Sequence, residues 1–271
     1  MTNVSKDTPS GKTPFSGLIR WFQDNGLTIL IIVGVVLVWE WGERLTNYPP
    51  PYVVPLPSSI FHYLTNKWGF LMENLVVTLG EALVGFVIGN FLAIALAVGC
   101  VFSDKLERII MPFALALRSI PTIAITPVLV FMLGVGAAPK LAVAALVTFF
   151  PTLVNMIVGL KNVDYRMLEL MHVLNATKWQ VLIRIRLLSS VPSLFAALKI
   201  AVPSAILGAA IAEWINASAG IGYLIIMSTY QFNADMLYAT MVLTTAVTAA
   251  AYLLVIVSER LLLPWQKNRS V

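Results

Sequence analysis

Long apolar segments separated by short polar intervals dominate the pattern of hydrophobic and polar positions along the 271 residues of this chain. A helix needs about 20 predominantly apolar residues to cross the hydrocarbon core of a membrane. Segments of about this length lie near residues 27–44, 77–102, 109–134, 140–160, 191–213 and 236–262. The pattern therefore predicts an all-α, polytopic membrane protein with six transmembrane helices.

The distribution of lysine and arginine predicts how these helices are oriented. If both ends of the chain lie in the cytoplasm, 13 of the 18 basic residues fall on that side, most of them in residues 161–190 and at the two ends. The outer side then carries three, including Lys140, while Arg118 and Lys199 fall within spans. Because cytoplasmic loops are enriched in Lys and Arg, we expect both termini and residues 161–190 in the cytoplasm.

The composition agrees with a membrane protein and disfavours soluble classes. Only 11% of the residues are charged, whereas a soluble domain carries about a quarter charged residues. The net charge of +5 would indicate a nucleic-acid partner only if the basic residues clustered on one solvated face. They are instead spread over several loops, so we expect membrane lipid and no nucleic acid around this chain.

The sequence shows no catalytic or metal-binding motif. His62 and His172 lie far apart and, with Cys100 as the single cysteine, cannot form a metal site. Residues 134–140 contain glycines and a lysine, but not in the order of a phosphate-binding loop. We therefore expect a transport subunit that is not itself an enzyme and that binds no metal ion or cofactor.

The longest charged interval, residues 164–192, predicts two short helices that meet at a break. Asn175 tolerates the left-handed conformation that ends many helices. Thr177 followed by Gln180 is a capping-box pattern, so the second helix is expected to start at Thr177. Pro192 is expected to begin the next membrane helix, at a position that needs no amide donor. Such a bend on the water side of a membrane protein would fit into a groove on the surface of a partner protein.

The third apolar segment is interrupted by three prolines, including Pro121, and contains Arg118. A charged side chain at mid-membrane depth costs roughly 2.5–3.5 kcal/mol on insertion scales, so it usually faces protein or water. Two interpretations compete for Arg118. It lines a polar path and meets an anionic substrate, or it pairs with a structural carboxylate such as Glu107 or Glu81, and we favour the pairing.

Small residues spaced by four predict close helix contacts on two segments. We expect these stripes to pack within the subunit rather than between subunits. They are formed by Gly85, Gly89, Ala93 and Ala97, and by Ala197, Ala201, Ala205 and Ala209 beside Gly208.

Two charged side chains of the fifth segment are expected to reach the membrane interface. Lys199 would extend its ammonium group towards the water. Glu213 would lie at the interface beside an anchoring Trp214, although a gate or a substrate contact is the competing interpretation. Residues 215–235 would form a short external or re-entrant piece.

The order of segments predicts four parts of the chain. Residues 1–26 would be a cytoplasmic tail, and residues 27–76 would hold the first span with an external proline-rich and amphipathic segment that reaches Trp68. Residues 77–263 would form the transmembrane core, followed by a short cytoplasmic tail at 264–271.

A self-contained secondary transporter or channel, or a structural membrane scaffold, would have a similar pattern of spans. Secondary transporters usually carry intramembrane carboxylates and an internal repeat. Here the spans hold almost no carboxylates and the two halves show no clear repeat. This argues against ion-coupled transport.

Several motifs match the pattern of a known family. Glu169, Leu170 and Met171 occupy the Glu-Ala-Ala position of that family's cytoplasmic coupling loop, and Asn175 occupies its Gly position. The match also includes Leu187–Leu188 and residues 117–121, 149–151, 174–180 and 219–225. On these motifs the chain resembles the permease subunits of binding-protein-dependent ABC importers, most of all the sulfonate, taurine and nitrate type, over roughly residues 27–263.

The resemblance implies a type I ABC importer permease fold in a bacterial cytoplasmic (inner) membrane, with a coupling loop at 161–190. It implies three partners: a cytoplasmic ATPase dimer that would bind ATP and magnesium, a second permease subunit, identical or different, and a periplasmic or lipid-anchored substrate-binding protein. The expected substrate is a small anion, and the alternative is a vitamin precursor of the pyrimidine or riboflavin type.

The resemblance also implies two sets of site residues. Those expected to couple to the ATPase are Glu169, Leu170, Met171, Asn175, Ala176, Thr177, Lys178 and Trp179. The conduit would be lined by the third and fifth spans, with Arg118, Pro121, Ala205, Gly208 and Glu213 as candidates for the translocation path.

Overall fold

The computed structural model describes residues 26, 30–31, 33–42, 44–46, 50 and 53–264. Nearly all of the two expected cytoplasmic tails lies outside the described residues, as do parts of the first span and of the proline-rich segment. The chain divides into two compact units, Met1–His62 and Tyr63–Val271.

In the first unit, residues 33–42 are helical and a carboxylate from this helix holds the start of the next one. Glu40 accepts hydrogen bonds from the backbone N–H of Ser58, at 3.1 Å, and from its hydroxyl, at 2.8 Å. Ser58 lies in the first turn of α2, Pro57–Asn66. Glu40 therefore supplies an acceptor to one of the amides that a helix leaves unpaired at its start.

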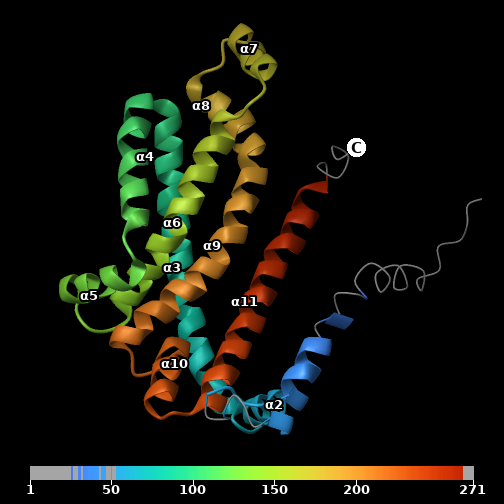
Figure 1. Cartoon of the computed structure of the whole chain (residues 1–271). Coiled ribbons are helices and arrows are strands. Elements are labelled where there is room, and N and C mark those ends of the chain that lie inside the picture. The colour runs from blue at the N-terminus through green and yellow to red at the C-terminus, as the bar shows by residue number, and fades with distance from the viewer. Residues whose placement is uncertain are drawn as a thin grey trace, which may run out of the picture. The chain divides into compact units, whose positions relative to one another are not determined.

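The second unit consists of helices throughout its described residues (Figure 1). They are α3 (Trp68–Phe102), α4 (Asp104–Ser119), α5 (Thr122–Leu133), α6 (Ala137–Lys161), α7 (Tyr165–Val173), α8 (Lys178–Val181), the π-helical turn η1 (Leu182–Arg186), α9 (Leu187–Asn216), α10 (Ile221–Tyr230) and α11 (Ala234–Leu262). The prediction of an all-α, multi-pass membrane protein is confirmed.

Four helices among the described residues are long and apolar enough to cross a membrane. They are α3, α6, the continuous stretch Lys178–Ile215, and α11. The pair α4 and α5 bends by 102° at a short break and would form a fifth, broken span. The first predicted span lies partly outside the described residues, so six spans with both termini in the cytoplasm remain a prediction.

Helix α6 packs against both α3 and α9, and small residues allow the close approach. A Cβ atom on Gly85 or Gly89 of α3 would overlap the backbone of α6, and one on Gly208 of α9 would lie 2.7 Å from Val147. The four alanines of the α9 stripe are at most 2% exposed. Because small residues let helix backbones approach each other, both stripes pack within the subunit, as predicted.

Three details of the helices differ from the predictions. Helix α3 begins at Trp68 rather than near residue 77, so the expected amphipathic segment is helical as α2 but ends at Asn66 and does not reach Trp68. Pro192 lies inside α9 rather than at its start. The helix that begins at Lys178 continues through η1, whose wider turn joins it to α9 without a break.

Lys199 has a partner that the sequence did not predict. Its Nζ lies 2.5 Å from a carboxylate oxygen of Glu259, and both side chains are less than one-third exposed. A lysine on α9 finds this partner because α11 packs alongside. The ion pair therefore links two membrane helices.

Candidate functional site

The bend between α7 and α8 is built from two recognisable helix-end motifs. Asn175 has φ 54°, the left-handed conformation predicted for it. Its N–H donates to the carbonyl of His172 at 3.0 Å, and the N–H of Ala176 donates to the carbonyl of Met171 at 2.9 Å. This is the bond pattern of a Schellman motif, which satisfies the free carbonyls at a helix end.

The start of α8 is fixed by the predicted capping box. The N–H of Gln180 donates to the hydroxyl oxygen of Thr177 at 3.3 Å, and the N–H of Thr177 donates to the side-chain oxygen of Gln180 at 2.8 Å. Two otherwise unpaired amides are thereby satisfied reciprocally. The bend is therefore defined by backbone geometry on both of its sides.

Contacts with the ends of the long helices hold this bend in place. The rings of Trp179 and Phe102 have centroids 5.0 Å apart, and Met171 is 7% exposed. Arg186 donates to the carbonyl of Leu160, the penultimate residue of α6, at 2.8 Å. A force applied to the bend would therefore reach α3, α6 and α9.

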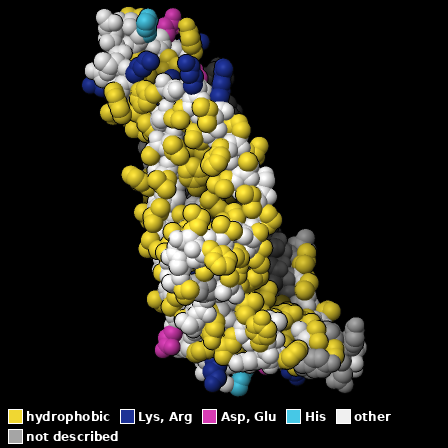
Figure 2. Space-filling model, turned by 90° about the vertical axis from the view of Figure 1, so that its left-hand side faces the viewer, with side chains coloured by type: hydrophobic (Ala, Val, Ile, Leu, Met, Phe, Trp, Pro, Cys, Tyr) yellow, Lys and Arg dark blue, Asp and Glu magenta, His cyan; other side chains and the backbone are white. Residues whose placement is uncertain are grey.

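Several apolar side chains of α7 and α8 nevertheless remain uncovered. Leu170 is 55% exposed, Val173 77%, Leu174 66% and Trp179 62%, and Glu169 and Lys178 are exposed beside them. In Figure 2, Lys and Arg side chains gather at this end of the molecule, above a largely apolar surface. Exposed apolar residues surrounded by charges are typical of a protein–protein contact.

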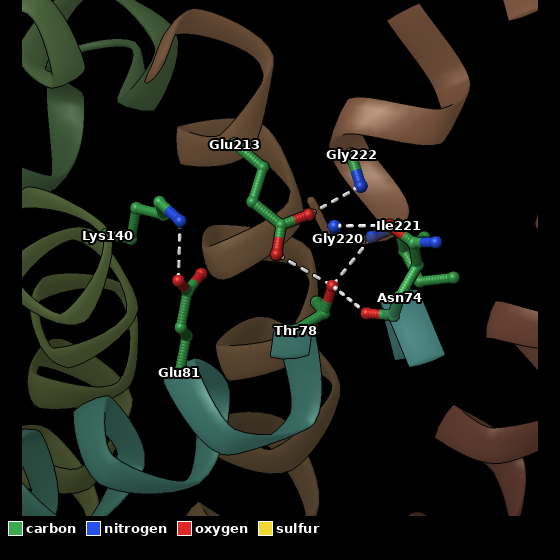
Figure 3. A network of polar contacts seen from close by, with 8 residues as sticks. All are labelled: Asn74, Thr78, Glu81, Lys140, Glu213, Gly220, Ile221 and Gly222. Carbon is green, nitrogen blue, oxygen red and sulfur yellow. Dashed lines mark hydrogen bonds and ion pairs between the residues drawn. The ribbon is translucent and has the colours of Figure 1, made fainter. Parts of the chain in front are cut away.

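A second group of polar residues is buried between α3, α9 and α10 (Figure 3). Glu213 is 1% exposed. Its carboxylate accepts a hydrogen bond from the Thr78 hydroxyl at 2.7 Å and another from the N–H of Gly222 at 2.6 Å. The N–H of Ile221 donates to Thr78 at 2.7 Å, and that of Gly220 donates to Asn74 at 2.8 Å. Side chains from α3 and α9 thus satisfy three successive amides at the start of α10.

The expected place of Glu213 at the interface beside Trp214 is therefore wrong. The turn after α9 folds back over the carboxylate, and Gly220, at φ 118°, leaves room for it because a Cβ atom there would overlap Glu213. The amides that begin a helix attract negative charge. Glu213 is held in this place because its carboxylate accepts the N–H of Gly222 at the start of α10.

Glu81 of α3 and Lys140 of α6 form a buried ion pair, shown in Figure 3. Their side chains are each 10% exposed, and Nζ lies 2.5 Å from Oε1. The expectation that the spans hold almost no carboxylates is thus corrected by Glu81, Glu213 and Glu259. The sequence indicated this pair only weakly: Glu81 lies within one apolar segment and Lys140 at the edge of another. Their charges compensate each other only when the two helices pack together.

Arg118 lies in the last turn of α4, immediately before the bend at Pro121. Its guanidinium carbon lies 4.8 Å from the centroid of the Phe150 ring, a cation–π distance. The expected pairing with Glu81 or Glu107 is wrong, because Glu81 binds Lys140 and Glu107 binds Lys161. Arg118 instead lines a cavity of about 260 Å³ together with Thr122 and Phe149.

The five candidates for the translocation path do not form one site in this chain. Arg118 lies beside the bend that begins at Pro121. Ala205 and Gly208 lie in the contacts of α9 with α3 and α6, and Glu213 belongs to the network at α10. Pro121 lies between two residues that line the Arg118 cavity, and of the other three only Gly208 approaches it, through Val147.

The family model and the similar curated proteins agree on one family for this chain. Residues 85–268 match the model of the binding-protein-dependent transport system inner membrane component. The chain is 31% identical to the formylaminopyrimidine transport permease ThiX of Halalkalibacterium halodurans, over 89% of this chain and 96% of the relative. It is 27% identical to the riboflavin transport system permease RibX of Chloroflexus aurantiacus (90% and 91% covered) and to the putative aliphatic sulfonates transport permease SsuC of Bacillus subtilis (89% and 87%).

Proposed function

The chain belongs to the family of binding-protein-dependent transport system inner membrane components, and we propose that it is one permease subunit of an ATP-driven importer. In this proposal it spans the cytoplasmic membrane of a bacterium six times, with both termini inside. It pairs with a second permease subunit, receives solute from a substrate-binding protein, and leaves ATP and magnesium binding to a separate ATPase dimer.

The bend between α7 and α8 carries this proposal. It is held by a Schellman motif and a capping box, and it exposes Glu169, Leu174 and Trp179 at the side that the basic residues favour as cytoplasmic. A short rigid plug of this kind suits a groove in the ATPase. We propose that the set from Glu169 to Trp179 named above forms this contact.

Transport would follow from movement of this plug. Closure of the ATPase dimer on ATP would move the bend, and the contacts of Arg186 and Trp179 would pass that movement to α6 and α3. The conduit would then switch between outward and inward access. Such a switch requires that the plug bind the two ATPase states with different affinity.

We propose a small anion of the sulfonate, taurine or nitrate type as the substrate. A second candidate is a vitamin precursor, which the names of the formylaminopyrimidine and riboflavin relatives favour. Ligand-induced thermal stabilisation of the co-purified binding protein, measured with compounds of both types, would distinguish the two.

The proposal is tested by purifying the tagged chain gently from its own host and identifying what accompanies it. We expect a stoichiometric ATPase with a phosphate-binding loop. Glu169→Lys should lower its recovery several-fold, whereas the same charge reversal at the exposed Glu73, near the other end of α3, should not. A chain that purifies alone and moves solute in proteoliposomes without ATP would instead be a secondary transporter or channel.

A further inference from the structure

Among the described residues, Arg118 is an unpaired cationic side chain on the broken span formed by α4 and α5, and in this subunit it is exposed at the edge of the cavity that it lines. It lies 14 residues after Asp104, which is about 21 Å along an α-helix at 1.5 Å per residue. The hydrocarbon core is about 30 Å thick. The Phe150 ring against which Arg118 lies belongs to the middle of α6, Ala137–Lys161. Both helices therefore put the guanidinium well inside the membrane.

No carboxylate compensates this charge within the part of the chain that the structure describes. Glu81 pairs with Lys140, Glu107 with Lys161 and Glu259 with Lys199, while Glu213 accepts from Thr78 and Gly222. Polar side chains inside membranes are costly and mark functional sites unless they are paired. The face of the Phe150 ring stabilises the cation only in part.

The cavity beside Arg118 is large enough for a small ion. Its volume is about 260 Å³, whereas one water needs roughly 10–15 Å³ on such a measure. Arg118 is the only charged residue among the described residues of its lining; Thr122 is polar and the remaining lining residues, which include Leu117, Val147 and Phe149, are apolar. An anion that enters this cavity meets a cation beside mostly apolar side chains, where the attraction is stronger than in open water.

We propose that this cavity at the α4–α5 bend is an anion-binding station on the translocation path, and that Arg118 contacts the anionic group of the solute. The inference rests on the proposed import function and deepens it, because it assigns the substrate to the class of small organic or inorganic anions. The bend between α4 and α5 creates this binding site, because it leaves a cavity beside the Arg118 guanidinium at mid-membrane depth.

Charge-selective labelling tests the station without knowledge of the natural substrate. In full-length chain with Cys100→Ala, a cysteine introduced as Thr122→Cys is treated in membranes with two thiol reagents, the anionic sulfonatoethyl methanethiosulfonate and the cationic trimethylammonioethyl methanethiosulfonate. Rates are normalised to those of a small free thiol in water. The anionic reagent should be favoured about tenfold, and adding Arg118→Gln should abolish that preference.

A matched variant separates this effect from a general change of charge. Arg108→Gln removes the same charge from an exposed position of α4 and should leave the preference intact. The proposal is overturned if Thr122→Cys reacts with neither reagent, or if the preference is absent or survives Arg118→Gln. This readout needs no ATPase, so the failure of the chain to retain an ATPase would count against the import function alone.

Transport provides the second measurement. In the complete transporter reconstituted with its binding protein, ethanesulfonate, taurine and nitrate are compared with an uncharged pyrimidine. We expect ATP-dependent uptake of at least one anion, lowered tenfold or more by Arg118→Gln but little by Arg118→Lys, with ATPase recovery unchanged. Uptake of the pyrimidine alone would overturn the substrate class while leaving the importer intact.

Discussion

At the scale of single residues, the buried charged side chains explain how helices of such uniform apolar character find their positions. Glu213 binds Thr78 of α3 and the Gly222 amide of α10, and Lys140 of α6 binds Glu81 of α3. Apolar contacts between membrane helices are weakly specific, because lipid is as apolar as the side chains. A polar group in the same surroundings has few acceptable partners, so it selects one arrangement.

Removing the Glu213 carboxylate should destabilise the α9–α10 turn. Glu213→Ala would leave the buried N–H of Gly222 without an acceptor, which costs about 1–3 kcal/mol. The midpoint of thermal unfolding of the detergent-solubilised chain should fall clearly. Glu73→Ala, which removes an exposed carboxylate from α3, should leave it unchanged, and equal midpoints for the two variants would contradict the capping role.

The Glu81–Lys140 pair should behave as a unit. Lys140→Met leaves the buried Glu81 carboxylate uncompensated, a loss of about 3–5 kcal/mol for a buried pair. Glu81→Met combined with Lys140→Met replaces both charges by apolar groups and should recover most of the lost stability. The measurement is the same thermal midpoint, and a double variant no more stable than Lys140→Met would show that the pair is not coupled.

At the scale of helices, the bend between α7 and α8 was predictable because its geometry depends on local residues. Asn175 and the Thr177–Gln180 capping box determine where one helix ends and the next begins, and both are confirmed. The burial of Glu213 and the partners of Lys140 and Lys199 were not predictable, because they depend on which helices pack side by side. Pro192 was misjudged because the helix that begins at Lys178 continues through η1 into α9, so the proline falls inside a longer helix.

Breaking the capping box should weaken the proposed contact with the ATPase but not membrane insertion. Thr177→Pro removes both the amide that donates to Gln180 and the hydroxyl that accepts from it; loss of a cap costs about 1 kcal/mol. We expect several-fold less ATPase to co-purify with this variant at equal membrane content. Asn175→Gly, which retains the left-handed conformation, should leave recovery at the wild-type level, and the same recovery from Thr177→Pro would argue against a preformed bend.

At the scale of the whole molecule, the family follows from motifs, whereas the substrate depends on a site that the motifs do not define. The prolines of the third segment indicated an interruption, and the structure shows two helices at 102° with a cavity beside Arg118. The sequence could not exclude a carboxylate partner for Arg118, because the candidates lie 11 and 37 residues away along the chain. Only the positions of Lys140 and Lys161 show that those carboxylates are already paired.

The orientation of the chain gives a decisive test at this scale, since the proposed contact with the ATPase requires α7 and α8 on the cytoplasmic side. In the Cys100→Ala background, Glu169→Cys and Gln231→Cys each introduce one exposed thiol, the first on α7 and the second between α10 and α11. A membrane-impermeant thiol reagent should label Gln231→Cys in right-side-out vesicles and Glu169→Cys only in inside-out vesicles, because the basic loops remain inside. Labelling of both from one side would contradict the proposed topology, and labelling in the reverse order would place the helical pair outside the cell, where no ATPase could reach it.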